Sequence, residues 1–98
     1  MNFPLNGWKN KNGTAERFCK CGSWKNHLIN NSGKDWPLLC CASDCIQAAE
    51  VGAHVINPVL EGEWIIPLCK ACNQRNDTFS ISSLTEPVFA NKEKMGCA

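Results

Sequence analysis

The chain has 98 residues, 8 of them cysteines, and a formal net charge of only +1. This length fits one domain with a modest apolar core, and such small domains commonly add disulfides or a metal ion for stability. No segment approaches the roughly 18 apolar residues that span a bilayer, and the N-terminus lacks the apolar region of a signal peptide, which argues against membrane and secreted proteins. We therefore expect a cytoplasmic protein, in which paired cysteines bind metal more often than they form disulfides.

Residues 1–37 are predicted to form an N-terminal extension. Its first 17 residues are polar and without period, so we expect an irregular arm. A CKCGSW unit follows, and SWKNHLIN has the apolar spacing of a short helix that begins after Ser23.

The charge is distributed unevenly along the chain. Residues 1–34 carry a net +5, whereas residues 35–90 carry a net −5. A surface that binds nucleic-acid phosphates would therefore lie on the extension. Its candidate contacts are Lys9, Lys11, Lys20, Lys25 and Lys34. The alternative is an ordinary solvated surface of mixed charge.

Residues 38–80 are predicted to form the core of a single structural domain, followed by a weakly patterned tail at 81–98. In chain order we expect a cysteine-rich loop, a strand, a return strand and a short helix, at residues 38–45, 50–56, 63–68 and from Cys69 onward. The first strand alternates, with Val51, Ala53 and Val55 on one face and His54 on the other.

Four cysteines of this core have the spacing of a tetrahedral zinc site. Cys69 and Cys72 form a CxxC pair, which lets one tight turn present two thiolates to the same ion. The second pair would be Cys45 with either Cys40 or Cys41, and we favour Cys40. Two cysteine loops joined by a hairpin, the second opening a helix, is the order of a treble-clef zinc finger. We therefore predict a small α+β zinc-binding domain with an N-terminal cysteine-bearing extension.

A second zinc ion is a separate hypothesis. Its ligands would be Cys19, Cys21, His27 and Cys41. The alternative is a reduced CxC thiol pair beside a surface histidine.

The segment CASDC…VGAHVINP…EWIIPLCKACN resembles the HNH, or ββα-metal, endonuclease family across about residues 38–80. The resemblance implies that His54 matches the general base and that Asn73 matches a ligand of the catalytic Mg²⁺ or Mn²⁺. The chain departs from the family pattern at two positions. Ala53 stands where a metal-binding side chain is usual, and Trp64 stands where an asparagine often braces the base. An alanine cannot coordinate a hard cation, which prefers oxygen ligands.

These residues leave three functions open. The first is a zinc-binding HNH-like module that binds nucleic acid, with nuclease activity weak or lost. The second is a small phage or bacterial interaction or inhibitor protein that presents a protein-binding surface on the zinc scaffold. The third is an active metal-dependent endonuclease. In the non-catalytic cases His54 would be a structural ring or a zinc ligand. The sequence leaves the oligomeric state open.

Overall fold

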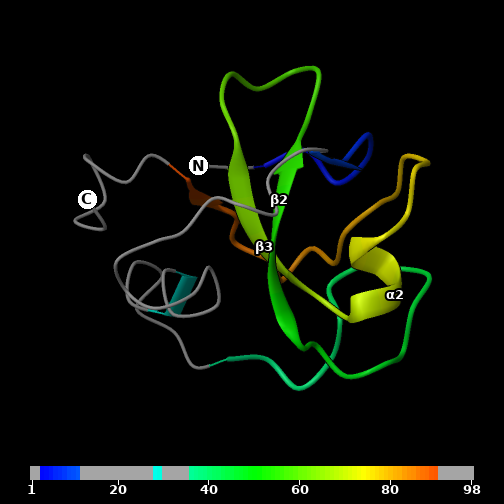
Figure 1. Cartoon of the computed structure of the whole chain (residues 1–98). Coiled ribbons are helices and arrows are strands. Elements are labelled where there is room, and N and C mark those ends of the chain that lie inside the picture. The colour runs from blue at the N-terminus through cyan, green and yellow to red at the C-terminus, as the bar shows by residue number, and fades with distance from the viewer. Residues whose placement is uncertain (1–2, 12–27, 30–35, 91–98) are drawn as a thin grey trace.

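The computed structural model describes residues 3–11, 28–29 and 36–90 (Figure 1). Within them, four antiparallel strands form one sheet in the order β1-β2-β3-β4, and a short helix, α2, follows β3. The elements are β1 (Lys9–Asn10), β2 (Val51–Ile56), β3 (Trp64–Leu68), α2 (Lys70–Asn73) and β4 (Val88–Phe89). No helix in the described part of the chain is long and apolar enough to cross a bilayer.

The central hairpin confirms the prediction from sequence, with each strand beginning one residue later than expected. β2 pairs with β3 in a register that sets Ala53 opposite Ile66 and His54 opposite Ile65. Residues that face each other across an antiparallel pair point to the same side of the sheet. The register therefore decides which side chains share a face with His54.

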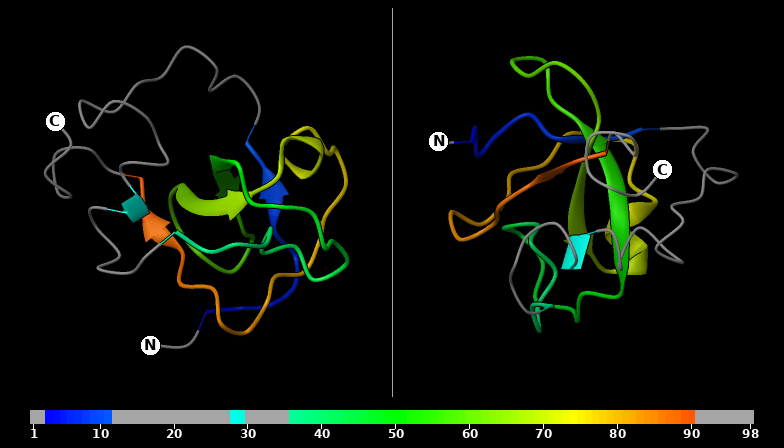
Figure 2. Two further views of the ribbon diagram at one scale, coloured as in Figure 1. Left: turned by 90° about the horizontal axis from the view of Figure 1, so that it is seen from below. Right: turned by 90° about the vertical axis from the view of Figure 1, so that its left-hand side faces the viewer.

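The sheet buries a different apolar cluster on each face. On one face Ala53, Val55 and Ile66 pack in a cluster with four buried cysteines, one of which is Cys72 of α2. On the other face Ile65 packs with Val88 and Leu28. Figures 1 and 2 accordingly show α2 and residues 28–29 on opposite sides of the hairpin. The helical residues 28–29 agree with the predicted first helix, whose other residues lie outside the described part.

The arm is predicted to be irregular, with Trp8 packed against the core; the packing of Trp8 agrees, but residues 8–10 form β pairings instead of an irregular segment. Trp8 is fully buried in the cluster that contains the cysteines, and its backbone forms a bridge with Phe79. The next two residues form β1, which pairs with β2. Burial of a whole indole side chain stabilises this edge strand, although two residues are too few to produce a periodic sequence pattern.

The weakly patterned segment after residue 80 also joins the sheet. Ile81 is buried and forms a bridge with Ala42 in the cysteine loop. β4 then pairs with β3, directly after Pro87. Both ends of the described chain thus contribute an edge strand to the sheet of the predicted core.

Gly62 permits a close approach between the hairpin connection and β4. Its φ is +85°, and a Cβ atom there would lie 2.5 Å from Cε1 of Phe89. Gly7 has the same backbone conformation, φ +84°, but the nearest atoms would lie 3.7 Å away. We expect Gly62→Ala to lower the free energy of unfolding by about 1–3 kcal/mol more than Gly7→Ala, because only the former adds a clash to the backbone strain. Equal losses in urea unfolding of the two variants would contradict this.

Candidate metal centre

Four cysteine sulfurs converge at one end of the hairpin. The Sγ atoms of Cys40, Cys45, Cys69 and Cys72 all lie within 4.8 Å of one another. The pair Cys45–Cys69 is separated by 3.7 Å. A tetrahedral ion with Zn–S bonds near 2.3 Å requires sulfurs about 3.8 Å apart. The cluster therefore suits one zinc ion, and it contains Cys40 rather than Cys41, as the sequence favoured.

The first cysteine pair, Cys40 and Cys45, is held by a closed loop. The backbone N–H of Cys40 donates to Gln47 O at 2.9 Å, and that of Cys45 donates to Ala42 O at 3.1 Å. The N–H of Gln47 approaches Cys45 Sγ at 3.5 Å. This contact restricts the orientation of the Cys45 side chain.

The second pair is held by the start of α2. Cys69 directly follows β3 and is the N-cap of the helix, and its Sγ accepts from the N–H of Cys72 at 3.4 Å. Asn10 holds the other end of the helix, because its Nδ2 donates to Cys72 O at 2.7 Å and to Arg75 O at 3.0 Å. A buried side chain of β1 thus fixes the turn that carries a ligand 62 residues later.

The pKa values of three of the four clustered thiols are displaced from the ordinary cysteine value. Burial raises the pKa of Cys40, and burial followed by hydrogen bonding with Cys69 raises the pKa of Cys72. At Cys69 burial is outweighed by hydrogen bonds from Cys72 and the neighbouring thiols, so its pKa is lowered. Cys69 therefore ionises more easily than Cys40 or Cys72. A bound divalent ion favours the thiolate form of all three, because it offsets the negative charges.

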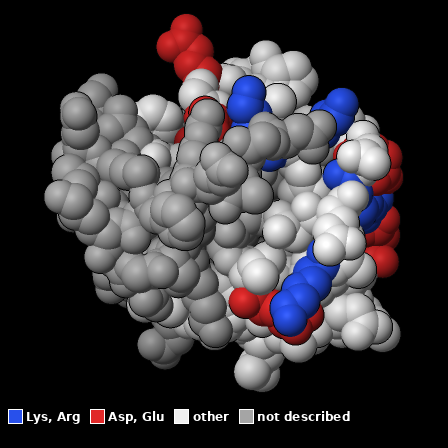
Figure 3. All heavy atoms as spheres, in the orientation of Figure 1, with Lys and Arg blue, Asp and Glu red and all other residues white. Residues whose placement is uncertain are grey.

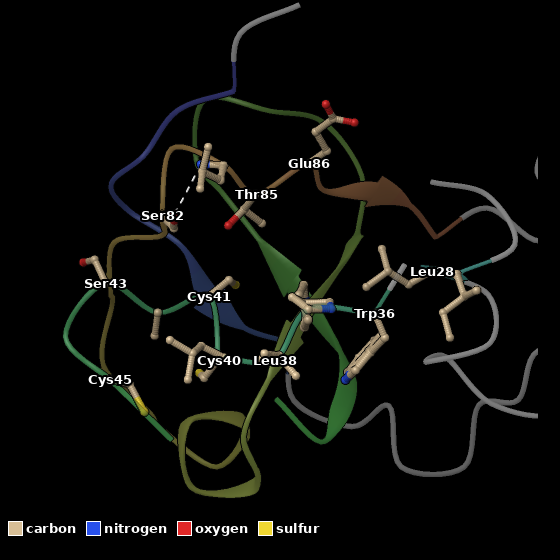
Figure 4. Close-up of a pocket in the computed structure, with 16 residues that line it drawn as sticks. Leu28, Trp36, Leu38, Cys40, Cys41, Ser43, Cys45, Ser82, Thr85 and Glu86 are labelled. Atoms are coloured by element: carbon tan, nitrogen blue, oxygen red, sulfur yellow. Dashed lines mark hydrogen bonds between the residues drawn. The ribbon is translucent and has the colours of Figure 1, made fainter. Parts of the chain in front are cut away.

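Cys41 lies outside the cluster. It is buried, and burial followed by the charge of Cys40 raises its pKa to about 12. It lines a pocket beside Thr85 (Figure 4). The other three proposed ligands of a second zinc ion, Cys19, Cys21 and His27, lie outside the described residues. The second site stays a prediction.

The structure does not bring His54 and Asn73 together. His54 is 5% exposed and shares the face of Ile65, which is the face opposite to Cys72 and α2. Asn73 is exposed at the end of α2. Ala53 points toward the cysteines, and Trp64 packs between Phe3 and Phe89. Among the described residues His54 is not a member of the metal-binding group.

Two of the five candidate phosphate-binding lysines are described. Lys9 and Lys11 are exposed and flank Asn10, whose side chain points toward α2, so alternation places both on the opposite face. The remaining three, Lys20, Lys25 and Lys34, lie outside the described residues. Figure 3 shows basic and acidic side chains intermixed on the described part of the visible face.

Asp44 and Arg75, which the sequence analysis did not single out, also belong to this site. Asp44 immediately precedes Cys45 in the sequence. The guanidinium of Arg75 binds the Asp44 carboxylate at 2.9 Å. The two residues are separated by 31 positions in the sequence, which leaves no local signal for the contact.

No family model, curated protein or solved structure matches this chain. What the structure shows is a four-cysteine cluster on a small antiparallel sheet. The HNH resemblance is supported by the sequence motifs alone.

Proposed function

We propose that this protein is a non-catalytic zinc module of HNH-like, treble-clef descent that binds nucleic acid in the cytoplasm. The observation that carries the proposal is the closed cluster of four cysteine sulfurs. Structural zinc sites have four protein ligands, whereas catalytic sites keep one position for water or substrate. With Cys40, Cys45, Cys69 and Cys72 bound, the ion would have no such position.

Loss of nuclease activity is supported by the placement of the family's functional positions. A general base must lie within hydrogen-bond reach of the water that it activates near the catalytic metal. His54 and the helix that bears Asn73 lie on opposite faces of the sheet. Ala53, on the helix side, offers no ligand. Incubation of a plasmid with Mg²⁺ or Mn²⁺ should therefore leave it unnicked, and nicking abolished by His54→Ala would restore the nuclease hypothesis.

Nucleic-acid binding is supported by the basic N-terminal side. Lys9 and Lys11 are exposed on one face of the sheet and precede the segment that carries Lys20, Lys25 and Lys34. Lys70 and Arg75 lie against carboxylates, at 4.0 Å from Glu50 and 2.6 Å from Asp77, and these acids would repel phosphate. Among the described lysines we assign phosphate contacts to Lys9 and Lys11, because both are exposed and directly precede the other candidate lysines in the sequence.

Reversing these two charges tests the assignment. We expect Lys9→Glu/Lys11→Glu to weaken binding of short DNA and RNA oligonucleotides at least tenfold, and to reduce the slope of log K against log salt by about 2, because each lysine releases about one counterion. Fluorescence anisotropy from 50 to 200 mM salt measures both quantities. Lys70→Glu is the matched control, since Lys70 already lies beside Glu50. An equal loss in the control, or no binding by the native protein at low salt, would contradict the proposal.

A protein partner is the second candidate, and an exposed apolar surface favours it. Leu38 and Leu84 are 88% and 86% exposed and border a pocket of about 570 Å³ that also contains Trp36 (Figure 4). Apolar surface of this kind is enriched at interaction sites. A small phage or bacterial inhibitor would use it to bind its target. If oligonucleotides do not bind, loss of a purified partner complex on Leu38→Asp/Leu84→Asp would support this candidate.

A further inference from the structure

Arg75 joins the two halves of the cysteine cluster through a pair of carboxylates. Its Nη1 donates to both Asp44 oxygens, at 2.9 and 3.1 Å. Its Nε and Nη2 donate to the two Asp77 oxygens, at 2.9 and 2.6 Å. Asp44 lies in the loop that carries Cys40 and Cys45, whereas Arg75 and Asp77 follow the helix that carries Cys72. The guanidinium therefore spans the two ligand-bearing segments.

The guanidinium is well placed for this role. Its Cζ lies 5.2 Å from the centroid of the buried Phe79 ring, which restricts its position and adds a cation–π contact. The Arg75 side chain is only 23% exposed. Hydrogen bonds to Asp77 and then to Asp44 raise the pKa of Arg75, so it stays charged at every relevant pH. The pair with Asp77 is two-pronged, through Nε and Nη2, and this geometry orients the guanidinium so that Nη1 faces Asp44.

Of the four clustered cysteines, Cys45 is the one whose position depends most on the contact between Arg75 and Asp44. It is half-buried, whereas the other three ligands are buried. Its neighbour Asp44 is the residue that Arg75 holds. We infer that Arg75 is a positioning residue for the zinc site, and that its bond to Asp44 holds the Cys40–Cys45 loop in the geometry that completes the tetrahedron. This inference rests on the proposed zinc function.

Charge compensation is the competing explanation, and the structure argues against it. Zn²⁺ with four thiolates carries a charge of −2, which a nearby cation would offset. Arg75, however, carries two carboxylates with it, so the group of three has a net charge of −1. This net charge favours an effect on the ion through position, and the guanidinium also interacts with the side chain of Cys72.

Asp44 and Asp77 provide a matched test, since both bind Arg75 and their side chains are 61% and 60% exposed. We expect Asp44→Ala to weaken Zn²⁺ binding about tenfold, in the range typical of residues that orient metal ligands. Asp77→Ala should weaken it less than about threefold, because its bond to Arg75 lies within one segment. Arg75→Lys should resemble Asp44→Ala, because lysine keeps the charge but has no second nitrogen with which to reach Asp44 while it binds Asp77. Zn²⁺ affinity is measured by competition with a chromogenic chelator.

Two further measurements separate positioning from a general loss of stability. Gly62→Ala destabilises the sheet away from the cysteines, so its Zn²⁺ affinity shows how much stability alone contributes. The rate of Zn²⁺ release to excess chelator should rise for Asp44→Ala and stay unchanged for Asp77→Ala. Equal effects of the two aspartate variants, or native affinity in Asp44→Ala, would overturn the positioning role while leaving the zinc site intact. A native protein that binds no Zn²⁺ would overturn the role and the proposed zinc function together.

Discussion

Cys69→Ala should abolish zinc binding at the four-cysteine cluster and leave the domain largely unfolded at room temperature. Structural zinc ions contribute about 10–16 kcal/mol of apparent binding free energy, which is coupled to folding in small metal domains. This contribution is comparable to the roughly 5–15 kcal/mol by which an ordinary domain is stable. Cys69 also caps α2 with its sulfur, so the variant loses a metal ligand and a helix cap together.

Cys41→Ala is the matched control for this prediction. Cys41 is buried like Cys69, at 6% against 2% exposure, but its sulfur is outside the metal-binding group. It should therefore retain a zinc ion at the four-cysteine cluster and a folded spectrum. Native mass spectrometry counts the bound zinc, and amide dispersion in a proton–nitrogen NMR spectrum reports the fold. A well-dispersed, zinc-loaded Cys69→Ala protein would show that this cluster is not the structural site.

The sequence was most informative where its signals were local. The alternation along residues 50–56, the return strand and the spacing of Cys69 and Cys72 predicted the hairpin and half of the metal centre. Each of these signals depends on residues within one element or one turn. Alternation also predicted correctly that His54 and Val55 lie on opposite faces of the sheet, because successive side chains of a strand point to opposite sides.

Contacts between distant segments could not be obtained in this way. β1 and β4 have two residues each, which is too short for a period, and their position depends on burial of Trp8 and Val88. The contacts of Asn10 and Arg75 span 62 and 31 residues. The side on which α2 packs is set by the path of the chain after Leu68. The sequence alone therefore could place His54 on a face without showing that this face is opposite to the metal centre.

Trp8→Ala should give the largest loss of stability among substitutions that leave the metal ligands intact. Trp8 is 0% exposed, and its Nε1 donates to Pro4 O at 2.8 Å. Its backbone exchanges two hydrogen bonds with Phe79, at 3.1 and 2.8 Å. Truncation of a buried tryptophan typically costs about 3–5 kcal/mol, through lost burial and the cavity left behind. For a domain of this size that corresponds to a fall in Tm of more than about 12 °C.

Trp64→Ala distinguishes this effect from the loss of any aromatic ring. Trp64 is half-buried and contacts Phe3 and Phe89 at centroid distances of 5.5 and 5.2 Å, but it lies at the edge of the cluster in which Trp8 is enclosed. Its truncation should cost about 1–2 kcal/mol, because water can fill much of the space that the ring leaves. Urea unfolding of both zinc-loaded variants gives the comparison. If the two losses are equal, Trp8 is no more important than a surface aromatic, and the docking of β1 does not depend on its burial. The expected difference instead makes Trp8 the anchor that brings Asn10 to the end of α2, and so connects the N-terminal segment to the metal centre.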